Sequence, residues 1–159
     1  MVKDKMGRVN IFKLIGIGAV ASSLALLDNS IKNKIEDGTI DNGVIQKTKG
    51  FAEIEKHHNK GLPMNKLDDH TKEITAVSCG AMFFQAMNTL NDAMAKDDAV
   101  VDAANAMILA GALSNTYDRV ERGYVVDYLK IGRKRAIYNL SDFLIIFGVI
   151  IRFIKALTD

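Results

Sequence analysis

The stretch "FLIIFGVII", Phe143 to Ile151, runs for nine residues without a polar side chain. Arg152 and Lys155 appear only beyond its far end. A helix on the surface of a water-soluble bundle shows a polar residue at every third or fourth position. The uninterrupted run therefore favours a helix that faces lipid. It lies in an apolar block at 137–157, close to the roughly 20 residues that a membrane span needs.

Three further apolar blocks precede it, at 11–27, 74–90 and 99–117. The first follows a basic start and resembles a signal peptide, but no small-x-small cleavage site and compact polar domain follow it, so we predict a retained helix. The second and third blocks are interrupted by polar residues. Averaged over the chain, 48% hydrophobic and 25% charged residues are ordinary values for a soluble protein. Hydropathy alone therefore leaves a soluble bundle of amphipathic helices open.

Charge and cysteine content exclude other classes. A formal net charge of +2 is too small to indicate a nucleic-acid surface. The single cysteine, Cys79, excludes a disulfide within the chain, and its apolar surroundings are typical of a small buried hydrophobic residue.

Taken together, these patterns predict one membrane-embedded domain over residues 1–159 with four transmembrane helices, at about 11–27, 74–90, 99–117 and 137–157. The basic N-terminus places both ends in the cytoplasm by the positive-inside rule, although the triplet Arg133–Arg135 opposes this arrangement. The segments 29–73 and 118–136 then lie outside. Turn pairs Asp37-Gly38 and Asn42-Gly43 predict a small extracytoplasmic β element.

Polar side chains gather at the ends of the last two helical blocks. Asp118, Asp127 and Asp142 are joined there by Asn115 and Asn139. Ionisable groups at membrane depth are costly and tend to be functional. The extended run before Asp127 is predicted to aim this residue at the helix start near Asn139. Two adjacent carboxylates share one proton, which is the arrangement of an aspartic protease.

Structural interpretations compete with this one. Asn139 and Asp142 have the spacing of a helix cap with an acid near the positive end of the helix dipole. Asp118 and Arg119 have the character of an interfacial ion pair. The histidines lack the spacing of a metal site, so we predict no metal and no cofactor.

Family resemblance favours the catalytic interpretation. "GALSNTYDRVERGYVVDY" (111–128) resembles the third signature of lipoprotein signal peptidases, and "NLSD" (139–142) resembles the Asn-x-Ala-Asp signature of their last helix. "LDNSIK" (27–32) and "HNKGLPMN" (58–65) resemble two further motifs, in family order. Leu62-Pro63 replaces Ala-Ala, which is the largest departure from the family pattern.

This resemblance implies an intramembrane aspartic endopeptidase that removes the signal peptide from diacylglyceryl-modified prolipoproteins in the bacterial cell membrane. By family position, Asp127 and Asp142 match the catalytic pair. The resemblance assigns the substrate pocket to Asn59, Asn115, Arg119 and Asn139, with Asp28 and Lys32 near its rim and Asp118 supporting the Arg119 region. Its implied partners are prolipoproteins, membrane lipid and globomycin-type inhibitors, with no nucleic acid.

Two other functions remain open on the sequence. The first is a non-catalytic membrane protein of the same fold that binds lipoprotein precursors or lipid. The second is a soluble helical interaction domain. The presence of both aspartates favours the enzyme.

Overall fold

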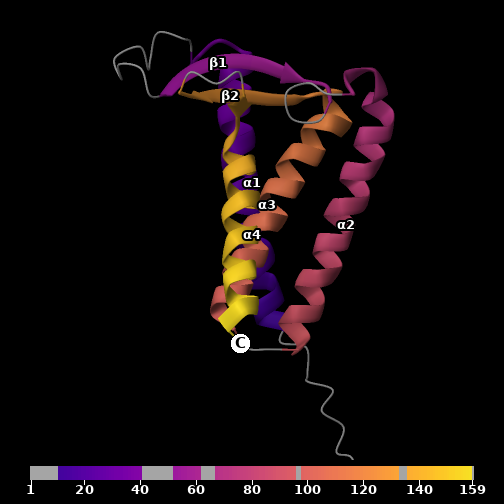
Figure 1. Cartoon of the computed structure of the whole chain (residues 1–159), viewed down its shortest axis with the longest axis vertical. Helices are drawn as coiled ribbons and strands as arrows, with labels where there is room; N and C mark the ends of the chain where they lie inside the picture. The colour runs from indigo at the N-terminus through magenta and orange to yellow at the C-terminus, as the bar shows by residue number, and fades with distance from the viewer. Residues whose placement is uncertain (1–10, 41–51, 62–66, 96–97, 133–135, 159) are drawn as a thin grey trace, which may run out of the picture.

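The protein is a helical bundle with a small antiparallel sheet across one end (Figure 1). The computed structural model describes residues 11–40, 52–61, 67–95, 98–132 and 136–158. Three positions discussed above, the Asn42-Gly43 pair, Leu62-Pro63 and Arg133–Arg135, lie outside the described residues. The four long helices are α1 (Ile11–Glu36), α2 (Thr71–Ala95), α3 (Ala99–Glu121) and α4 (Leu140–Thr158).

The helices extend beyond the apolar blocks. α1 continues to Glu36, past the apolar end at Leu27. It continues because Asp28 and Lys32, one turn apart, are both buried against other elements and form an ion pair. α4 in contrast begins at Leu140 and not at residue 137, because Ile137 and Tyr138 form the short strand β3.

The sheet has the order β1-β2-β3 with antiparallel neighbours. β1 (Ala52–Asn59) pairs with β2 (Val125–Ile131), so the predicted β element exists but its partner lies far along the chain. Asp37-Gly38 does not turn a hairpin between strands. Gly38 has a φ of +77° just beyond the end of α1, and Asp37 accepts a hydrogen bond from the Thr39 backbone at 2.8 Å.

β2 is the central strand, and its first four residues are all buried. Val126 and Tyr128 form an apolar cluster with Ile35 of α1. Asp127, between them, is directed to the opposite face of the strand, because successive side chains alternate. This strand therefore introduces a carboxylate at the junction between the sheet and the helices.

Most large apolar side chains on the helices point outward. Phe83 and Phe84 of α2 and Phe147 and Phe153 of α4 are each more than half exposed. By length and hydropathy, α1 is the one helix in the described part of the chain that qualifies as a candidate membrane span. The structure thus has the predicted helical bundle with a small sheet.

Candidate active site

Asp127 and Asp142 come together where β2 meets the first turn of α4. Asn139, the residue before α4, lies between them. Its side-chain amide donates to Asp127 Oδ1 at 2.8 Å, and its backbone N–H donates to Asp142 Oδ2 at 3.1 Å. One completely buried residue therefore holds both carboxylates.

Asp142 also takes part in a helix cap. Its backbone N–H donates to Asn139 Oδ1 at 2.9 Å, while its own carboxylate receives the Asn139 N–H. This reciprocal pair satisfies N–H groups that would otherwise be unpaired at the helix start. The capping interpretation is therefore correct, and it is compatible with a chemical role because Asp142 Oδ1 points elsewhere, to Asn115 Nδ2 at 3.1 Å.

Asp127 is held from both sides by amides. Asn59, the last residue of β1, donates through its side-chain amide to Asp127 Oδ2 at 3.1 Å, and the side-chain oxygen Oδ1 of Asn59 accepts the Gly61 backbone N–H at 3.1 Å. Burial, and then the charge of Asp142, raise the pKa of Asp127 to about 7. Asp127 therefore exists in both the neutral and the charged form near neutral pH.

Asn115 and Arg119, one turn apart on α3, complete the surroundings of Asp142. Asn115 Oδ1 accepts from Asn139 Nδ2 at 3.1 Å and from Lys32 Nζ at 3.0 Å. Arg119 donates through Nη2 to the Gly61 carbonyl at 3.2 Å. Its Nε is buried and has no hydrogen-bond partner within the described ranges, which leaves a donor for another molecule.

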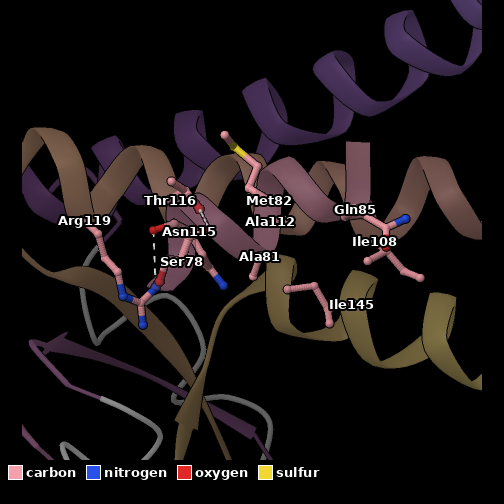
Figure 2. A pocket seen from close by; sticks show the side chains of 10 residues that line it. All are labelled: Ser78, Ala81, Met82, Gln85, Ile108, Ala112, Asn115, Thr116, Arg119 and Ile145. Carbon is pink, nitrogen blue, oxygen red and sulfur yellow. Dashed lines mark hydrogen bonds between the residues drawn. The ribbon is translucent and has the colours of Figure 1, made fainter. Parts of the chain in front are cut away.

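A cleft of about 340 Å³ opens beside these residues, between α2, α3 and α4. Figure 2 shows Arg119 and Asn115 at one end and Gln85 and Ile108 at the other. Its wall is mostly apolar, with Met82 and Ile145 among the lining residues. The described residues contain no group of three histidine, cysteine or acidic side chains placed to hold a metal ion.

The family model described as signal peptidase (SPase) II matches residues 20–158. This chain belongs to the signal peptidase II family. The family resemblance of the motifs is therefore confirmed, and membership makes the chain a peptidase.

Individual members of the signal peptidase II family are moderately similar to it. The lipoprotein signal peptidase of Dehalococcoides mccartyi is 28% identical over 133 residues, covering 82% of each chain. That of Caldanaerobacter subterraneus is 30% identical over 105 residues, covering 65% of this chain and 69% of the relative.

Two solved bacterial membrane enzymes share the fold. One, determined by the in meso method at 2.3 Å resolution, has a TM-score of 0.76 and 24% identity, and the match covers 97% of this chain and 92% of that one. The other, at 1.9 Å resolution, has a TM-score of 0.75 and 20% identity over 98% and 99% of the two chains.

Asp28 and Lys32 do not lie at a rim in this signal peptidase II family member. Both side chains are completely buried, and Lys32 Nζ lies 3.0 Å from carboxylate oxygens of Asp28 and Asp118. Lys32 also donates to Asn115, which itself donates to Asp142, so Lys32 is connected to the carboxylate pair through Asn115. Asp118 accepts from the Val126 backbone at 3.1 Å and therefore fixes the start of β2, with no bond to Arg119 among the described residues.

Sequence reasoning missed the partners of Asp28. Ser114 Oγ donates to Asp28 Oδ2 at 2.7 Å, Tyr128 OH donates to Oδ1 at 3.0 Å, and Ser141 Oγ is a third donor. Burial raises the pKa of the Tyr128 hydroxyl, which keeps its proton and remains a donor. The sequence signal that singled out Asp28 was the "LDNSIK" motif (27–32), which does not indicate its partners in α3, β2 and α4.

Proposed function

We propose that this chain is an intramembrane aspartic endopeptidase that removes the signal peptide from diacylglyceryl-modified prolipoproteins. The observation that carries the proposal is Asn139, which is hydrogen-bonded to both Asp127 and Asp142. Two relatives cited above bear the name lipoprotein signal peptidase, and the fold is that of bacterial membrane enzymes.

The surroundings of the two carboxylates favour different roles. Asp142 lies in the first turn of α4, where the positive end of the helix dipole and a backbone N–H stabilise a negative charge. Asp127 lies in a strand, buried to 3% exposure, with a pKa raised to about 7 by burial and by the charge of Asp142. We therefore assign the charged state to Asp142 and the proton to Asp127.

The proton steps of the cleavage follow from this assignment. Asp142 accepts a proton from water as the water oxygen attacks the scissile carbonyl carbon, and Asp127 donates its proton to the carbonyl oxygen. When the tetrahedral intermediate collapses, the C–N bond breaks. Asp142 then passes its proton to the leaving amine, and Asp127 recovers a proton from the hydroxyl. Both carboxyl groups return to their starting states.

Four polar residues near the aspartates are our candidates for substrate binding: Asn59, Asn115, Arg119 and Asn139. A peptide must be unwound to be cut, and its freed backbone groups need partners inside the bilayer. Amides donate and accept, and the arginine donates in a fixed fork. The buried Nε of Arg119 fits this role because it has no partner among the described residues.

The membrane arrangement belongs to the same proposal. We propose that all four helices span the bilayer, with both termini in the cytoplasm and the sheet outside. α2, with 25 residues, has a length of about 37 Å, enough for a hydrocarbon core of about 30 Å. The outward phenylalanines of α2 and α4 support lipid contact.

Cleavage of a diacylglyceryl-modified precursor by the purified protein tests the enzyme directly. We expect release of the signal peptide, and competition by globomycin-type inhibitors. Asp127→Asn and Asp142→Asn should each lower the rate more than tenfold, a barrier increase above about 1.4 kcal/mol, without preventing membrane insertion.

The matched control is Asp69→Asn, which makes the same change at an exposed acid. It should keep the wild-type rate. Retention of more than a tenth of the rate in either aspartate variant would disprove the pair, and binding of the precursor without any cleavage would favour the non-catalytic alternative.

A further inference from the structure

The fully buried side chains of α2 lie near its two ends. Ile74 is buried close to the sheet, and Thr89 and Ala93 are buried near the opposite end. None of the residues from 75 to 88 is buried. The helix packs chiefly against α3, and the cleft described above lies along its unburied middle.

A group of polar residues joins α2 to α4 at the end of this cleft that is farther from the sheet. We call it the lower polar cluster and define it as Gln85, Asp92, Asn105 and Arg152. Arg152 of α4 forms an ion pair with Asp92 of α2 and donates to Asn105 Oδ1 at 3.3 Å. Asn105, on α3 between them, donates to Asp92 at 2.9 Å.

The cluster is connected to the cleft through Gln85. This side chain lines the cleft and donates to Asn105 Oδ1 at 3.3 Å. Asn105 is 1% exposed, so its amide depends on these partners. Polar groups buried among apolar helices are costly when unpaired, so separation of α2 from α4 would leave several of them unsatisfied at once.

We propose that the lower polar cluster sets the separation of α2 and α4, and that this separation determines how well the cleft accepts the apolar segment of the substrate. The second part rests on the proposed function. Asn105 and Asn115 are ten residues apart on α3, or about 15 Å. The cluster meets the cleft at Gln85, and the other end of the cleft is lined by Asn115, which donates to Asp142. The members of the cluster are therefore positioning residues.

The helix separation is tested by distance measurement between spin labels. Phe84 of α2 and Phe147 of α4 are 67% and 52% exposed and suit labelling as Phe84→Cys and Phe147→Cys in a Cys79→Ser background. Asp92→Ala should give a longer or broader distance distribution than the intact cluster. The exchange Asp92→Arg with Arg152→Asp should return it toward the original.

The matched control is another ion pair of the same region. Lys13 of α1 lies 2.9 Å from Asp102 of α3, and these two helices already pack extensively. Asp102→Asn should leave the α2–α4 distance unchanged. An unchanged distribution in Asp92→Ala, or an equal change in Asp102→Asn, would overturn the proposal.

Cleavage kinetics test the consequence for substrate. With a diacylglyceryl-modified precursor, Asp92→Ala should raise KM roughly fivefold, within the range of couplings between contacting polar groups, and should change kcat less. The exchanged pair should recover most of the loss. A changed distance with unaltered KM would overturn the role in substrate acceptance. The distance measurement needs no substrate, so a chain without peptidase activity would refute the proposed function and leave the helix separation tested.

Discussion

Asn139 uses its side chain and its backbone for different carboxylates. The amide nitrogen binds Asp127, and the carbonyl oxygen and backbone N–H bind Asp142. A residue that caps a helix is normally exposed and replaceable at a cost of about 1 kcal/mol. Asn139 is completely buried, so its loss would disturb the cap and both carboxylates together.

The ionisation of Asp127 leads to a prediction about pH. Its pKa of about 7 means that it carries its proton below that pH and loses it above. If Asp127 is the proton donor, kcat/KM falls as pH rises through about 7. Asn59 donates to the charged form of Asp127 and lowers its pKa. Asn59→Ala should therefore move this fall to higher pH, in addition to lowering the rate.

A pH–rate profile of wild type and variant measures this effect. A profile that shifts to lower pH in Asn59→Ala, or does not move, would contradict the assignment of the proton to Asp127.

Lys32 predicts a stability effect. It is completely buried between Asp28 and Asp118, and it donates to Ser114 and Asn115. Lys32→Met would leave Asp28 without its cation and Asp118 with Arg122 alone, and breaking a buried ion pair typically costs about 3–5 kcal/mol. Thermal unfolding in detergent should show that Lys32→Met lowers the stability of the folded protein by a similar amount. Lys34→Met, at an exposed position of the same helix, should change stability little, and equal effects would refute the prediction.

Between elements, α3 and α4 pack at two glycines. A Cβ at Gly111 would lie 2.4 Å from the Ser141 carbonyl oxygen, and one at Gly148 would lie 2.8 Å from the Ala104 carbonyl oxygen. Small residues allow this close approach of helices in membranes. The contact at Gly111 lies one residue from Asp142, so it positions the carboxylate.

Gly111→Ala should therefore lower stability by about 1–3 kcal/mol, the usual cost of overpacking, and should reduce cleavage because it displaces the first turn of α4. Gly80→Ala is the control, since nothing lies within 4 Å of a Cβ there. Unfolding and cleavage assays on both variants measure the difference. Equal behaviour of the two would show that the close approach is unimportant.

In the whole molecule, the sheet lies at one end of the long helices and the C-terminus lies at the other end (Figure 1). The basic N-terminus then predicts that the sheet is outside the cell. In a Cys79→Ser background, His57→Cys and His58→Cys in β1 should react with a membrane-impermeant maleimide in intact cells. Leu157→Cys, at the opposite end and 72% exposed, should react only after permeabilisation. The reverse pattern would make Arg133–Arg135 the orientation signal.

Patterns local in the chain were sufficient for a large part of this description. The apolar blocks predicted four helices, because a helix that crosses a membrane needs about 20 mostly apolar residues in succession. The Asn139–Asp142 spacing predicted a helix start, because capping involves residues three apart. The motif order pointed to the signal peptidase II family, and with it to the two aspartates that β2 and α4 bring together.

Contacts between distant segments were decided only by the tertiary structure. β1 pairs with β2, and not within a hairpin of its own segment, and this pairing brings Asn59 to Asp127 across 68 residues of sequence. The partners of Asp28 come from α3, β2 and α4, and no local pattern records such a convergence. The burial of Asp28 and Lys32 is likewise decided by the packing of the helices. Both residues are typical of a polar helix end, yet packing against α3 removes both from solvent and places them near the carboxylates.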